Sequence, residues 1–162
     1  MEYVAGFVTI DDVDGFLDTI RAIGERHGCA VQAIDARYVA GERHLEKAWQ
    51  LATRERNRGE AIAEDPGLEW LLYAAGTRQL NRAFDLGVTT GENRLVIVVW
   101  GENESDAIAD IAEEIVPIEG LPEPDADRLV EWFDISRAER EATAADLEAL
   151  VCERVALLTV DR

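Results

Sequence analysis

The sequence predicts an α+β fold: one domain, residues 1–162, with a single mixed, largely antiparallel β-sheet of about four strands flanked by helices. Two observations predict it. Short runs of β-branched and apolar residues recur along the chain, between stretches whose apolar residues are spaced three and four apart. The helical stretches gather in the middle of the chain instead of alternating strictly with strands, which is typical of α+β proteins.

Four segments have the composition of strands. Residues 3–10 are rich in β-formers, and in residues 30–36 Val31 and Ala33 alternate with Gln32. Residues 94–100 form a near-continuous apolar run, as central strands do. Residues 155–160 complete the predicted set of four strands.

Three helices are predicted in the first half of the chain. The first starts near residue 13 and carries apolar residues three and four apart as far as residue 23. The second covers residues 42–57. Asp65 followed by Pro66 is typical of a helix start and predicts a short third helix over residues 66–75.

The rest of the chain supplies further helix starts. Thr77 is placed to cap a helix that continues to residue 86, and another is expected over about residues 106–115. The last predicted helix covers residues 144–154. Two pairs have the spacing of a capping box, Ser136 with Glu139 and Thr143 with Asp146.

Charge is the strongest global signal, with 34 acidic residues against 16 lysines and arginines and a net charge of −18. Lys47 is the only lysine. An acidic, arginine-rich, well-folded composition is expected in a cytosol of high salt, where hydrated carboxylates keep a surface soluble. Cys29 and Cys152 lie outside any metal-binding spacing, and the first ten residues lack the pattern of a signal peptide, so we expect a cytoplasmic protein without a membrane segment.

Enzymatic signatures are missing from the sequence. His27 and His44 show no paired-histidine spacing, and the chain contains no nucleophile elbow, phosphate loop or dinucleotide fingerprint. Carboxylate pairs carry no information in a chain with so many acids. We therefore expect no catalytic residues, no metal and no cofactor.

The segment from Arg37 to Arg82 departs from the acidic background. It holds eight lysines and arginines and seven acids, so that half of the cations of the chain lie in 46 residues. In the predicted helix 42–57, Arg43, His44, Lys47, Arg54 and Arg58 follow one flank of an apolar stripe. This arrangement indicates a cationic ridge; the alternative is a set of ion pairs such as Arg43 with Glu46 or Arg56 with Glu60.

The next predicted helix adds a second polar group. Arg78, Gln79 and Arg82 fall on one side of it, and Leu80, Ala83 and Phe84 are expected to point inward. Arginine and glutamine can hydrogen-bond phosphates and base edges, and a guanidinium can also stack on a base. Trp70 and Tyr73, just upstream, are typical of core residues, although either could present a ring face to a base.

Three stretches together resemble the small subunit of the archaeal KEOPS complex, the PRPK-binding protein family. They are IDARYVAGERHL at residues 34–45, EWLLYAAGTRQLNRAFDLGV at residues 69–88 and LVIVVWGE at residues 95–102. The order and spacing of the His44-Leu45 pair and of the unit from Ala75 to Gln79 carry the resemblance. The closing ERVALLTV at residues 153–160 is similar to the final segment of the family.

The resemblance implies a non-catalytic subunit that binds the small kinase/ATPase of the complex and captures tRNA by its single-stranded 3′ CCA end. A separate metalloprotein subunit transfers threonylcarbamoyl to the adenosine beside the anticodon. The positions implied to contact tRNA are His44, Lys47, Arg54, Arg78, Gln79 and Arg82. The positions implied to face the kinase are Leu147, Leu150, Val151 and Arg154.

High salt limits how such a protein can hold RNA. If four phosphates of a single strand were neutralised, a tenfold rise in salt would lower affinity by roughly three powers of ten. We therefore expect Arg78 and Gln79, acting by hydrogen bonds and stacking, to matter more than the outer arginines. Two other classes stay open: a small-molecule-binding regulatory domain with a cleft near Gly76 or Gly91, and a small acyltransferase-like enzyme.

Overall fold

The chain divides into two compact units in a computed structural model that describes residues 1–142 and 146–160. Unit 1 consists of Met1–Ala36 and Gly87–Pro122, and unit 2 of Arg37–Leu86 and Glu123–Arg162. Each unit therefore joins two segments that are distant in the sequence. The α+β class is confirmed: the described residues form one open sheet, in unit 1, together with helices in both units.

The sheet of unit 1 has the strand order β2-β3-β1-β4, and every pairing in it is antiparallel. The edge strand β4 is short and contains Pro117, which cannot donate a backbone hydrogen bond. Gly6 lies opposite Pro117, and this close approach requires glycine because a Cβ at residue 6 would collide with the Val116 carbonyl. The strands are β1 (Glu2–Ile10), β2 (Cys29–Asp35), β3 (Gly91–Gly101) and β4 (Val116–Ile118).

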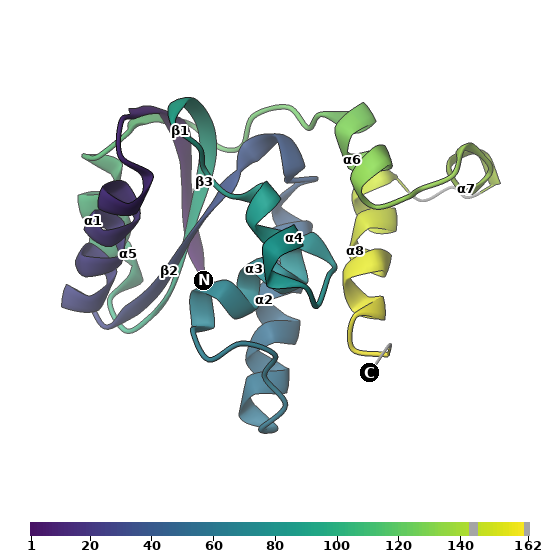
Figure 1. Ribbon diagram of the computed structural model, residues 1–162, viewed down its shortest axis with the longest axis horizontal. Coiled ribbons are helices and arrows are strands. Elements are labelled where there is room, and N and C mark those ends of the chain that lie inside the picture. Colours follow the sequence, from purple (N-terminus) through teal and green to yellow (C-terminus); the bar gives the residue numbers. More distant parts are fainter. Residues whose placement is uncertain (143–145, 161–162) are drawn as a thin grey trace. The chain divides into compact units, whose positions relative to one another are not determined.

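Helices α1 (Val13–Arg26) and α5 (Glu104–Ala112) cover one face of this sheet (Figure 1). The predicted apolar spacing of α1 is the cause, because it turns Ile20 and Ile23 toward the strands. Gly24 lets α1 approach closely, since a Cβ there would overlap the side chain of Val31 on β2. The core between helices and strands is closed and apolar.

In unit 2, helices α2, α3 and α8 pack against one another. Their facing sides are apolar and buried, with Leu45 and Ala48 from α2, Trp70 from α3, and Val151 and Val155 from α8. The elements with residues in unit 2 are η1 (Ala36–Tyr38), α2 (Glu42–Asn57), α3 (Pro66–Ala75), α4 (Leu80–Ala83), η2 (Phe84–Leu86), α6 (Ala126–Trp132), α7 (Arg137–Ala142) and α8 (Leu147–Leu157).

Two of the predicted helix starts are confirmed by hydrogen bonds, those at Asp65 and at Ser136. The Asp65 carboxylate accepts a hydrogen bond from the Gly67 N–H at 2.9 Å and starts α3, as predicted. Ser136 and Glu139 form the predicted reciprocal capping box, with bonds of 3.0 and 3.1 Å. The pair of Thr143 with Asp146 lies partly outside the described residues.

The predicted fourth strand is wrong in position. Residues 155–160 continue α8 and its closing turns, because Val155 is spaced four residues from the buried Val151 and packs on the same side of the helix. The fourth strand is instead β4, a stretch of three residues with Pro117 at its centre. Strand composition at residues 155–160 was overridden by helix packing.

The predicted helix over residues 77–86 is shorter than expected. The Thr77 hydroxyl accepts a hydrogen bond from the Gln79 N–H at 3.1 Å, which makes a turn, and the helix itself starts at Leu80. Phe84 is exposed, with 53% of its surface accessible to solvent, so its predicted inward orientation is wrong.

Two acids depart from the solvated acidic surface that the composition suggested. Glu55 and Glu69 are each 1% exposed. The Glu69 carboxylate accepts hydrogen bonds from the backbone N–H groups of Ile62 and Ala63, which fixes the loop between α2 and α3. Burial, together with these two carboxylates, raises the pKa of Tyr73 to about 12, so its phenol stays neutral.

Candidate nucleic-acid interface

A tight turn after α3 presents Arg78 and Gln79 to solvent. Gly76 ends the helix in the left-handed region, at φ 66°, and its N–H bonds the Tyr73 carbonyl while the Thr77 N–H bonds the Leu72 carbonyl. A side chain at residue 76 would also press on the Phe133 ring, 3.3 Å from the added Cβ. The geometry at residue 76 therefore requires glycine. The compact, hydrogen-bonded turn that it begins leaves the side chains of Arg78 and Gln79 exposed to solvent.

Beside this turn, arginine and aromatic side chains form a row. The Arg82 guanidinium lies 4.6 Å from the Trp132 ring centre, and the Trp132 ring meets Tyr38 edge to face at 5.5 Å. Arg128 lies over the other ring, 5.5 Å from the centre of Tyr38. The Trp132 indole N–H donates to the Ala75 carbonyl at 2.9 Å, which anchors the row to the end of α3.

Two hollows flank the Arg82–Trp132 pair. The first, about 370 Å³, has both apolar and polar residues in its lining, which includes Gly76, Thr77, Gln79, Arg82, Trp132, Phe133 and Arg154. The second, about 570 Å³, carries carboxylates beside the cations and is lined by Tyr38, Arg82, Asp125, Asp127, Arg128, Glu131 and Trp132. Guanidinium planes, an indole ring and carboxylate acceptors are groups that can stack on bases and bond their edges.

Ion pairing divides the predicted RNA-contacting residues into two groups. Arg78 and Arg82 are exposed and form no ion pair with any residue that the structure describes, and the same holds for the half-buried Lys47. Arg54, in contrast, bonds the buried Glu55 carboxylate at 3.0 Å. In a protein with twice as many acids as cations, an arginine without a carboxylate partner is open to an external anion or base.

The predicted cationic ridge on α2 is largely neutralised. Arg43 bonds Asp146 and Glu148, each at 2.8 Å, and Arg58 lies 3.6 Å from Glu55. Ion pairing, the alternative left open by the sequence, is therefore what the structure contains, although Arg43 takes partners from α8 in place of Glu46. The Arg43 backbone N–H also donates to Glu148, so this carboxylate caps α2 from another helix.

His44 is the predicted RNA-contacting residue that the structure places elsewhere. Its ring is fully buried, and both ring nitrogens are occupied within unit 2, by the Ala40 N–H and the Ala74 carbonyl. Burial lowers the pKa of His44, so the ring is neutral. A ring in this position cannot touch RNA, and we correct its role to a buried link between α2 and α3.

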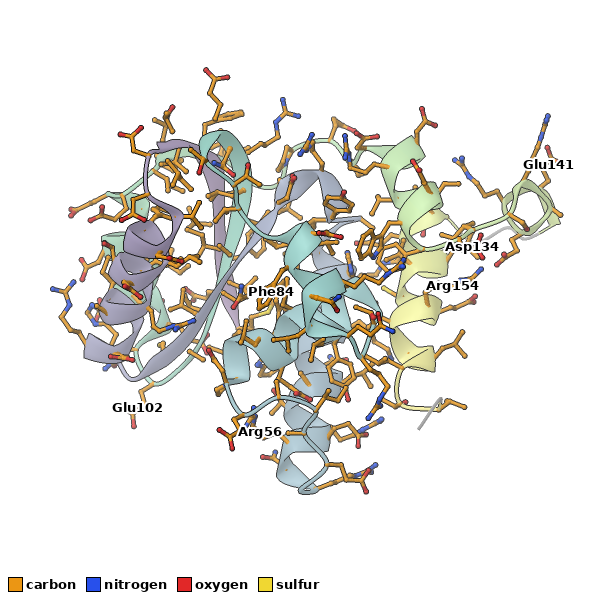
Figure 2. The ribbon with its side chains drawn as sticks, in the orientation of Figure 1. Arg56, Phe84, Glu102, Asp134, Glu141 and Arg154 are labelled. Atoms are coloured by element: carbon orange, nitrogen blue, oxygen red, sulfur yellow. The ribbon has the colours of Figure 1, made fainter. Side chains whose placement is uncertain are left out.

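The residues predicted to face the kinase are also divided. Leu150 and Val151 are buried against the other helices of unit 2, so they are core residues and not contact residues; Leu147 is half-buried. Arg154 donates to the Phe133 and Asp134 carbonyls and pairs with Glu139, near the Asp134 backbone in Figure 2.

The exposed apolar residues at this end of the chain are different ones. Leu157, the last residue of α8, is 45% exposed, and Val160 just beyond it is 72% exposed.

Sequence reasoning missed the contribution of residues 123–135. Trp132, Tyr38 and Arg128 complete the row around Arg82, and two of the three come from α6, far from the predicted segment. A tryptophan at the end of a short amphipathic helix is typical of a core residue, so only proximity in space reveals its partner.

Within residues 1–142 and 146–160, no group of histidine, cysteine and acidic side chains is arranged to hold a metal ion. None of the described helices combines the length and the hydrophobicity needed to cross a bilayer.

The structure defines an α+β protein in which arginine side chains lie beside half-buried aromatic rings at the surface of unit 2. The sequence matches the family described as kinase binding protein CGI-121 over residues 12–159, and the chain belongs to this family, whose members are kinase-binding subunits of the KEOPS complex. A search of curated proteins gave no match.

Proposed function

We propose that this chain is the KEOPS subunit that recruits tRNA through its 3′ CCA end and binds the small kinase/ATPase of the complex. In this role it supports threonylcarbamoyladenosine formation beside the anticodon, with the metalloprotein transferase subunit as an indirect partner, and is itself non-catalytic. The family match supports the kinase-binding part. The net charge of −18 and the two free thiols favour a cytoplasm of high salt.

The observation that carries the RNA part is the turn with Arg78, Gln79 and Arg82. All three side chains are exposed, neither arginine has an ion-pair partner among the described residues, and Arg82 already lies against the Trp132 ring. A guanidinium that lies over an indole ring can offer its other face to a base, and stacking of this kind tolerates salt better than contacts to phosphate do. Gln79 can bond base edges.

The experiment measures binding of tRNA with and without its CCA end, at low and at molar KCl. We expect the wild-type protein to prefer the intact end at both salt concentrations. A variant with Arg78→Ala and Gln79→Ala, and a variant with Arg82→Ala, should each lose about tenfold or more in affinity, the equivalent of about 1.4 kcal/mol, at the low end for one stacked base.

Arg94→Ala is the matched control. Arg94 is an exposed arginine of unit 1 that also lies over an aromatic ring, 5.6 Å from the centre of Phe7. Its replacement by alanine therefore removes one positive charge and one cation–π contact, as Arg82→Ala does. It should bind tRNA as the wild-type protein does. Equal affinity of the wild-type protein for tRNA with and without the CCA end would end the proposal.

A small-molecule-binding regulatory role is the second candidate, favoured by the hollow beside Gly76. Thermal-shift measurements with metabolites distinguish it: stabilisation by a metabolite, with no effect of tRNA, would favour this role over RNA binding.

A further inference from the structure

The last four carbonyl groups of a helix have no partner within the helix, and α3 ends directly before the Arg78–Gln79 turn. All four are occupied here. The Leu72 and Tyr73 carbonyls accept from the backbone of the turn, as described above. The Ala74 carbonyl accepts from His44 Nε2 at 2.8 Å, and the Ala75 carbonyl from the Trp132 indole at 2.9 Å.

Two of the four donors are therefore side chains from other helices. Trp132 comes from α6 and already contacts Arg82. His44 comes from α2, and its ring nitrogens bond backbone groups, of Ala40 and Ala74. The C-terminus of α3 is held by one side chain from α2 and one from α6, and these bonds also hold the direction of the turn that follows.

The hydrogen bonds of His44 select one tautomer. The Ala40 N–H donates to Nδ1 at 3.1 Å, so Nδ1 carries no proton and Nε2–H is the donor to Ala74. The ring also meets the Phe133 ring edge to face, with centres 5.8 Å apart. Phe133 is the ring against which Gly76 packs, so His44 holds the turn through Ala74 and through this neighbour.

We propose that His44 is a positioning residue for the RNA contact: through its Nε2–H on the Ala74 carbonyl it sets the direction of Arg78 and Gln79 without touching RNA. This inference rests on the proposed function and deepens it. A positioning residue differs from an ordinary core residue because its effect on binding depends on one hydrogen bond and not on overall stability.

Two conservative substitutions separate the two hydrogen bonds. His44→Gln places an amide N–H near the position of Nε2 and can keep the bond to Ala74, whereas His44→Asn places its oxygen near Nδ1 and keeps only the bond from Ala40. Trp70→Phe is the matched control. It removes the Trp70 indole bond to the Leu45 carbonyl, another buried link between α2 and α3, away from the turn.

Three quantities are measured for each variant: thermal stability, amide hydrogen exchange in residues 76–82, and affinity for tRNA with and without the CCA end. All three variants should be less stable than the wild-type protein. Only His44→Asn should exchange faster in residues 76–82, and only it should lose about tenfold in CCA-dependent affinity, as expected for one lost base contact.

The inference is overturned if His44→Gln and His44→Asn behave alike, or if Trp70→Phe loosens the turn and lowers affinity as much as His44→Asn does. Wild-type protein that binds both RNAs equally would instead defeat the proposed function. In that case the exchange data alone still decide whether His44 fixes the turn.

Discussion

His44 stands in the sequence among cationic residues, yet in the fold its ring is buried between segments of unit 2. The sequence identified the residue as important but could not identify its surroundings, because burial depends on Ala74, which follows thirty residues later in the chain. A contact between residues so far apart in the sequence cannot be predicted from local spacing, so the sequence alone could not show that His44 is buried.

Because the His44 ring is buried, the free energy of unfolding should decrease as the pH is lowered below 6.5. The pKa of His44 is lowered from 6.5 in the folded protein, so below pH 6.5 the unfolded chain binds a proton that the folded chain does not. Between pH 6.5 and 5 the free energy of unfolding should drop by up to about 1.4 kcal/mol per pH unit. Urea unfolding at several pH values measures the slope, and His44→Gln should flatten it.

His27→Gln is the matched control for this slope, since the chain has two histidines and His27 is partly exposed beside Asp110. It should keep most of the pH dependence in this window. A slope unchanged in His44→Gln would contradict the assignment of the effect to the buried ring.

The arginines show a similar limit of sequence reasoning. The sequence grouped Arg54 with Arg78 and Arg82, because all are cationic and lie in the same segment. In the structure Arg54 is paired with Glu55 and the other two have no ion-pair partner among the described residues. The partner of Arg54 is its neighbour in the sequence, but Glu55 differs from most of the 34 acids in being buried, and no spacing rule reveals that burial.

At the scale of single elements, local signals predicted α2 and α3 with the bounds that the structure has. These signals worked because caps, glycine stops and apolar spacing act within one helix turn. Strand assignment failed for residues 155–160 and for β4, because three residues with a central proline carry no strand signal and form only by pairing with β1.

Helix α8 leads to a prediction about kinase binding. The exposed apolar side chains at its end are Leu157 and Val160, so these, and not the buried Leu150 and Val151, should contact the kinase. A variant with Leu157→Glu and Val160→Glu should lose co-purification with the kinase subunit while its thermal stability stays within about 1 kcal/mol of wild type, as surface substitutions generally do.

Val116→Glu provides the comparison, since Val116 is a similarly exposed apolar residue on β4 of unit 1. It should leave kinase binding unchanged. Retention of the kinase by the α8 variant would place the kinase-binding surface elsewhere on the molecule.

For the whole molecule, the net charge of −18 sets the response to salt. Repulsion among carboxylates opposes the compact state, and screening shortens from about 10 Å at 0.1 M salt to about 3 Å at 1 M. The urea midpoint should therefore rise as KCl is raised from 0.1 to above 1 M. A midpoint that is independent of KCl would argue against adaptation to high salt.

The division into two units is what sequence reasoning could least provide. Composition changes little near Ala36 and Leu86. The third boundary, at Pro122, lies among Pro117, Gly120 and Pro124, but a stretch of about eight residues is typical of a loop inside one domain and does not by itself indicate a division. The prediction of one domain stays a prediction: it requires that unit 1 and unit 2 unfold in one transition, which coincident transitions from different probes would indicate.

The pairing of β1 with β3 has a consequence for the time course of folding. Glu2 at the start of the chain faces Val99, and the whole Arg37–Leu86 segment lies between β2 and β3 in the sequence. Pairings this distant in sequence form slowly. At a synthesis rate of about 5–20 residues per second, β1 leaves the ribosome seconds before its partner exists and waits with both edges unpaired. Helices α1, α2 and α3 can form in that interval, so part of the helical structure can exist before the first strand finds a neighbour, whereas α6 and α8 of unit 2 are still to be synthesised.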